Sequence, residues 1–85
     1  MARTIDLDTI QNLSLIEKNE KLPLKKGYDN CLFCGKPVLV NSKTPYVHLL
    51  TSGYITTEEV HPDSQGLFPV GPECKNKVDK EFVFV

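Results

Sequence analysis

Three cysteines and one histidine constrain what this chain can fold into more than any other residues. Cys31 and Cys34 belong to a Cys-x-x-Cys-Gly turn, and Cys74 comes much later in the chain, directly after Gly71-Pro72-Glu73. The turn can direct two thiolates toward one ion, and a cysteine at the start of a helix can supply a third. The spacing therefore predicts one structural Zn2+ per chain.

A structural zinc ion takes four ligands in a tetrahedral arrangement, so the three cysteines leave one position to fill. We predict that His48 fills it, because it lies in a predicted strand that can hold the imidazole ring toward the metal. A plain structural interpretation of His48 stays open, in which its ring is hydrogen-bonded and no metal lies nearby. The alternative ligands are water and the side chains of His61, Asp29, Asp63 and Glu73.

The size and cysteine content of the chain also favour a metal. A chain of 85 residues buries only about 60–65% of its unfolded surface, so its core is marginal unless a metal or another cross-link supports it. An odd number of cysteines cannot be fully paired in internal disulfides, and no apolar run approaches the length of a membrane span. We therefore expect a cytoplasmic protein with reduced thiols and no membrane association.

The N-terminal part of the chain has a different pattern from the rest. Asp8 and Gln11 form a capping-box pattern, and apolar residues then recur at three-residue steps, which predicts a short helix over Thr9–Asn19. Pro23 should end this helix, and Gly27 breaks regular structure again. We predict a helical or flexible arm with a linker over residues 1–27. The arm can either pack on the remaining domain or become ordered on a partner.

Residues 28–85 are predicted to form the zinc-binding domain, with mostly β structure before Cys74. Apolar and β-branched residues, separated by turn signals, predict strands that together form an antiparallel meander. These strands cover Val38–Val40, Tyr46–Leu50 and Tyr54–Thr57. Leu67–Val70 should be a further extended piece at a sheet edge, because Pro69 cannot donate a hydrogen bond to a ladder.

The chain is predicted to end in a helix that begins after Gly71-Pro72. Its first turn would carry Cys74, and the four-residue spacing to Val78 and Phe82 places these three side chains on one face. The expected fold is therefore a small α+β domain with a zinc knuckle, a short meander and a C-terminal helix that carries a zinc ligand.

This order of elements resembles the treble-clef zinc fingers over roughly residues 29–82. Such fingers usually offer two ligands around the start of the helix, whereas Gly71 stands where the partner of Cys74 would be. The segments around Tyr46–Leu49, Ser64–Gly66 and Pro69–Cys74 are also similar to small uncharacterised proteins of bacteriophages and mobile elements. That second resemblance implies no known activity. The hypothesis that accompanies it is a small accessory or regulatory protein of a phage or mobile element, in the host cytoplasm.

The sequence favours a binding module over an enzyme. Some treble-clef proteins are HNH nucleases, and His48 with Asn76 imitates their pattern, but no second histidine or acid adjoins His48. A catalytic zinc is disfavoured because no nearby carboxylate is evident as a general base. We therefore predict a zinc-stabilised module that binds and modulates another protein through the N-terminal helix, the loop 58–66 or the apolar end Phe82–Val85.

Binding to a nucleic acid is the alternative. A net charge of −1 disfavours a strong hold on phosphates, which usually needs a clearly basic surface. Tyr46 or Tyr54 could nevertheless stack on bases beside a group of lysines. These lysines are Lys25, Lys26, Lys36, Lys43, Lys75 and Lys77.

Overall fold

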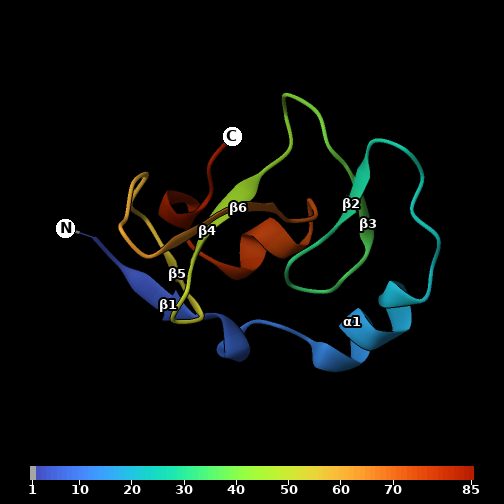
Figure 1. The fold of residues 1–85 in the computed structure, drawn as a ribbon, viewed down its shortest axis with the longest axis horizontal. Helices are drawn as coiled ribbons and strands as arrows, with labels where there is room; N and C mark the ends of the chain where they lie inside the picture. The colour runs from blue at the N-terminus through green and yellow to red at the C-terminus, as the bar shows by residue number, and fades with distance from the viewer. Residues whose placement is uncertain (1) are drawn as a thin grey trace.

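The structure is a computed structural model, and it describes residues 2–85 (Figure 1). Its largest element is an antiparallel sheet of four strands in the order β1-β5-β4-β6. The strands are β1 (Thr4–Asp6), β4 (Tyr46–Leu50), β5 (Tyr54–Thr56) and β6 (Ser64–Pro69). The predicted hairpin between Tyr46–Leu50 and Tyr54–Thr57 is confirmed, because β4 pairs with β5 through Leu49 and Ile55.

The centre of this sheet provides most of the apolar core. Strand β4 is buried at every position after Tyr46, and Ile55 of β5 and Phe82 from the C-terminal segment have no exposed surface. A β-bulge between Leu49 and Leu50 interrupts the pairing of β4 with β6. Because β4 is covered on both faces, its polar residue His48 is also removed from water.

A second sheet contains only two strands, β2 (Tyr28–Asn30) and β3 (Pro37–Leu39). They pair antiparallel, and the turn that joins them contains Cys31 and Cys34. The predicted meander is therefore wrong in one connection, since β3 pairs with β2 and not with β4. The prediction missed β2 because its residues Tyr28, Asp29 and Asn30 lack an apolar pattern.

The N-terminal residues are integrated into the fold. Strand β1 extends the large sheet at β5, and the short 3-10 helix η1 (Leu7–Thr9) leads to the helix α1 (Leu13–Glu20). The helix begins later than predicted because Asn12 caps it, with its side-chain oxygen accepting a hydrogen bond from the Leu15 N–H at 3.1 Å. Of residues 2–85, none belongs to a helix long and apolar enough to cross a bilayer.

The C-terminal segment forms two short 3-10 helices instead of the predicted continuous helix. These are η2 (Cys74–Lys77) and η3 (Lys80–Phe82), and Val78 between them is extended, with φ −128° and ψ 161°. The break directs Phe82 into the core, where Arg3 lies 5.2 Å above its ring. The apolar end then folds back onto the sheet, because Phe84 and Tyr46 exchange two backbone hydrogen bonds of 2.7 and 2.8 Å.

Candidate metal centre

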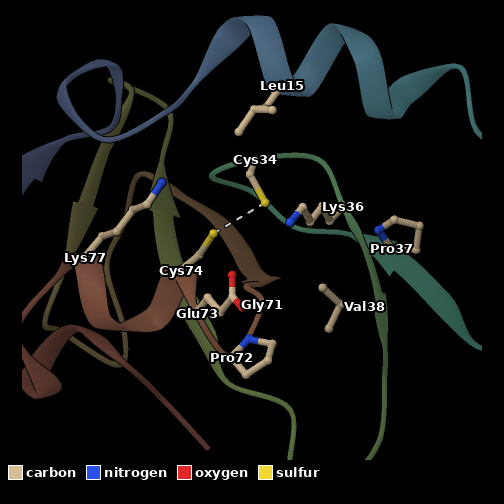
Figure 2. Close-up of a pocket in the computed structure, with 10 residues that line it drawn as sticks. All are labelled: Leu15, Cys34, Lys36, Pro37, Val38, Gly71, Pro72, Glu73, Cys74 and Lys77. Atoms are coloured by element: carbon tan, nitrogen blue, oxygen red, sulfur yellow. Dashed lines mark hydrogen bonds between the residues drawn. The ribbon is translucent and has the colours of Figure 1, made fainter.

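The structure brings the three cysteine sulfurs together (Figure 2 shows those of Cys34 and Cys74). All three thiols are free and buried, and their Sγ atoms lie within 4.8 Å of one another. The Sγ atoms of Cys34 and Cys74 are 3.4 Å apart. Two thiolates bound to one zinc ion at 2.3 Å and tetrahedral angles lie about 3.8 Å apart, so small shifts would fit the cluster around a metal.

The β2–β3 hairpin sets the position of two of these sulfurs. The Cys31 N–H donates to the Lys36 carbonyl at 2.8 Å, and the Gly35 N–H donates to the Cys31 carbonyl at 2.8 Å. Gly35 has a φ of +77°, a conformation that glycine adopts at little cost. This closed turn holds Cys31 and Cys34 on the same side, as the Cys-x-x-Cys-Gly motif predicts.

The third sulfur arrives from the far end of the chain. Cys74 begins η2, and the preceding Gly71 lies directly against the hairpin, where its N–H donates to the Cys31 sulfur at 3.2 Å. A side chain at position 71 would contact the Cys31 sulfur and Val38 at 3.9 Å. The segment before η2 is thus held close to the knuckle, the Cys31–Lys36 turn, by its own backbone.

Helix α1 supports the knuckle from the other side. The buried Asn19 side chain donates to the Cys34 carbonyl at 2.9 Å, and the Phe33 carbonyl accepts from the Asn12 N–H at 2.9 Å. A Cβ atom at Gly35 would lie 3.0 Å from the Ile16 Cα and 3.3 Å from the Asn19 Cβ. The helix therefore packs directly against the backbone that carries the cysteines.

This close approach gives the first testable prediction. Gly35→Ala should lower the free energy of unfolding by about 2–4 kcal/mol. The substitution puts a residue with a side chain at a positive φ, and its Cβ atom would push α1 away. Gly53→Ala is the matched control, since Gly53 also has a positive φ of +87° but has no atom within 4 Å of an added Cβ. Urea unfolding of both variants measures the difference, and equal losses would show that contact with α1 is unimportant.

Electrostatics at the cluster favour a bound cation. Burial opposes ionisation of Cys31, but N–H donors from Gly71, Phe33 and Cys34 outweigh it and lower the pKa of Cys31 below its ordinary value. Burial and the neighbouring sulfurs of Cys34 and Cys31 raise the pKa of Cys74 to about 12. The thiolate form of Cys31 is therefore stabilised, whereas ionisation of Cys74 beside it is opposed. A divalent cation would relieve the repulsion between two such thiolates.

His48, the predicted fourth ligand, does not join the sulfur cluster. It is 2% exposed in β4, and both of its ring nitrogens have partners within the fold. Its Nδ1 lies 2.7 Å from the Glu58 carbonyl oxygen, and its Nε2 lies 2.5 Å from the Ser64 hydroxyl oxygen. This is the plain structural alternative that the sequence left open, and we leave His48 out of the ligand set that we propose below.

The other predicted alternatives also lie outside the cluster. The His61 Nδ1 accepts a hydrogen bond from the Asp63 N–H at 3.0 Å, in the loop before β6. Asp29 belongs to β2, and Glu73 is exposed at the start of η2. Within residues 2–85, the three cysteines are therefore the only predicted ligands that come together in one cluster.

A cavity of about 310 Å³ opens beside the cluster (Figure 2). The Cys34 and Cys74 side chains line it, and the charged side chains of Lys36, Lys77 and Glu73 lie around it. From the sequence, Lys36 and Lys77 were candidates for phosphate contacts and Glu73 for a zinc ligand, but their position together beside the cysteines was not predicted. A signal was present, since Lys36 follows the knuckle glycine and Lys77 lies one turn after Cys74.

Comparisons with protein-family models, with curated proteins and with solved structures find no match for this chain.

Proposed function

We propose that this chain is a small zinc-stabilised module that binds another protein and has no catalytic activity of its own. The proposal of a metal site rests on one observation: three buried sulfurs from two distant segments of the chain lie within 4.8 Å of one another. Thiolates in a tetrahedral arrangement select zinc among the common cellular cations. In this proposal one Zn2+ per chain joins the β2–β3 hairpin to η2, as in the treble-clef fingers that the sequence resembles.

The β2–β3 hairpin presents exposed apolar side chains. They support the proposal that the partner is a protein. Tyr28 and Leu39 are directly opposite each other in the β2–β3 pair and therefore project from the same face. Leu39 is 50% exposed and Tyr28 is 38% exposed. We call Tyr28 and Leu39 the hairpin apolar face. Exposed apolar groups that cluster in this way are typical of interaction sites.

The charge beside this face indicates the chemistry of the partner. Residues 21–27, which lead into β2, carry Lys21, Lys25 and Lys26 and no acidic residue. A partner segment that combines apolar side chains with carboxylates would match both features. An accessory protein of a phage or mobile element, acting in the host cytoplasm, is compatible with such a role, and we retain it as part of the proposal.

Capture experiments with two matched variants test this proposal. Leu39→Asp should abolish capture of the specific partner from a host lysate, because it places a charge in the hairpin apolar face. Val60→Asp should leave capture unchanged, since Val60 is 86% exposed and lies in the loop before β6. Circular dichroism should show that both variants fold. Equal capture by both variants would contradict the assignment of the face.

The nucleic-acid alternative makes a separate prediction about salt. In that alternative phosphates would be contacted by Lys25, Lys26, Lys36, Lys43, Lys75 and Lys77. Such binding is strongest at low ionic strength. We expect no retention of single- or double-stranded DNA or RNA by the zinc-loaded protein at low salt. Retention that weakens steeply as salt is added would favour the nucleic-acid function over the protein partner.

A further inference from the structure

The sulfur cluster offers fewer ligands than zinc requires. Within residues 2–85 the cluster contains Cys31, Cys34 and Cys74, and no histidine nitrogen or carboxylate oxygen lies within 4.8 Å of all three sulfurs. The two ring nitrogens of His48 are already hydrogen-bonded elsewhere. A metal held by this cluster would keep its fourth position open to an incoming group.

The cavity beside the cluster provides the approach to that position. Cys34 and Cys74 line the cavity, whereas Cys31 does not belong to its lining and its sulfur accepts a hydrogen bond from the Gly71 N–H. In Figure 2 the Cys34 and Cys74 sulfurs point toward each other, with apolar wall residues around them. The apolar wall consists of Leu15, Pro37, Val38 and Pro72. An incoming group would therefore reach the metal between two of its sulfur ligands through a partly apolar passage.

The charges at the cavity mouth favour an anionic sulfur ligand. One Zn2+ with three thiolates has a net charge of −1, and a fourth thiolate would make it −2. Lys36, Lys77 and Glu73 border the cavity, and their combined charge of +1 partly offsets this increase. Thiolates are also the ligands that a sulfur-rich zinc site accepts most readily.

We infer that the fourth ligand of this metal is an external thiolate, which enters through the cavity between Cys34 and Cys74. The inference rests on the proposed function, because it requires the bound metal. A thiol from solution or a cysteine side chain of the protein partner has the required chemistry. On binding, the thiol gives its proton to solvent, a metal–sulfur bond forms and a metal–water bond breaks, with no change of oxidation state.

Cobalt substitution of the full chain tests the inference directly. Co2+ replaces Zn2+ in tetrahedral sites and reports each thiolate by a charge-transfer absorption band. The loaded protein should show the intensity of three cobalt–thiolate bonds, and glutathione or 2-mercaptoethanol should raise it by about one third as a fourth bond forms. A spectrum that no added thiol changes would overturn the inference while leaving the metal site intact.

One double variant and one single variant sharpen the test. Lys36→Ala with Lys77→Ala should raise the thiol concentration needed for the change several-fold, with the thiol-free spectrum unaltered. Cys34→Ser should lose intensity before thiol is added. Absence of any cobalt–thiolate band in the wild-type chain would instead refute the proposed metal site and this inference with it.

A capture experiment distinguishes a partner cysteine from a small thiol as the source of the thiolate. Blocking the thiols of the lysate with iodoacetamide should abolish partner capture by the zinc-loaded protein if a partner cysteine is the ligand. If a small thiol is the ligand, glutathione alone should produce the cobalt spectral change and the alkylated lysate should be captured as before. Failure of both arms would overturn the inference.

Discussion

Complete removal of the proposed zinc ion is expected to unfold the protein. Binding of structural zinc to zinc-finger peptides contributes on the order of 10–16 kcal/mol at neutral pH, which is as large as the whole stability of a typical domain. Here the hairpin that carries Cys31 and Cys34 contacts η2 through the same centre. Far-UV circular dichroism during titration with a chelator, with elemental analysis of zinc, should show loss of structure in step with loss of metal.

Variants of the ligands should reproduce the effect of the chelator. Cys74→Ser removes one thiolate and should leave a largely unfolded chain with far less than one zinc per molecule. Asn76→Ser is the matched control, because Asn76 is an exposed residue of the same 3-10 helix and should retain the metal and the fold. An unchanged circular dichroism spectrum after complete zinc removal would contradict this account.

The pH dependence of metal binding follows from the thiol pKa values. Because the metal-free chain is expected to be unfolded, its cysteines have the ordinary thiol pKa, which lies above neutral pH, and these protonated thiols must lose their protons when zinc binds. Zinc affinity should therefore rise as the pH rises and fall as the pH falls. Competition with a chromophoric chelator at several pH values measures this slope, and an affinity independent of pH would contradict protonated ligands.

The parts of this centre that short-range sequence determines could be predicted. The turn around Cys31 and Cys34 depends on a local Cys-x-x-Cys-Gly pattern and a glycine with positive φ at Gly35. The strands β4 and β5 are apolar enough to be recognised from their own residues. The position of Cys74 near a short helix start also follows from the Gly71-Pro72 signal, although that helix is η2 and ends at Lys77.

The parts that depend on distant partners could not be predicted. The pairing of β3 with β2 instead of β4 depends on the polar segment Tyr28–Asn30, which has no strand pattern of its own. The break at Val78 follows from the burial of Phe82 beside Arg3, a residue near the opposite end of the chain. Local propensity says little about either, because tertiary contacts decide them.

His48 is a single side chain whose role could not be predicted from local sequence, for the same reason. A histidine on a strand is equally suited to bind a metal or to fill a buried hydrogen-bonding position. The Glu58 carbonyl can only accept a hydrogen bond, so Nδ1 carries the proton and Nε2 accepts from the Ser64 hydroxyl. The ring also packs edge-on against Phe84, with centroids 6.5 Å apart. His48 thus connects β4 with Glu58, with Ser64 at the start of β6 and with the C-terminal end.

His48→Ala is therefore expected to destabilise the fold strongly while leaving the metal in place. Loss of a buried ring leaves a cavity and an unpaired Glu58 carbonyl, which together should lower the free energy of unfolding by about 3–5 kcal/mol. His61→Ala is the matched control, and its loss should stay below about 1 kcal/mol because His61 is only partly buried in a loop. Urea unfolding of the zinc-loaded variants compares the two.

Zinc content separates the two roles of this histidine. If His48 only supports the fold, His48→Ala under folding conditions retains one zinc per chain, and the cobalt-substituted variant keeps the spectrum of the wild-type protein. If it were a ligand, the zinc content and the cobalt spectrum would both change even where circular dichroism shows a folded chain.

Ser64→Ala provides a milder version of the same test, since it removes one hydrogen-bond partner of the ring. It should lower the free energy of unfolding by about 1 kcal/mol without altering the cobalt spectrum. A metal effect in that variant would place His48 at the metal centre after all.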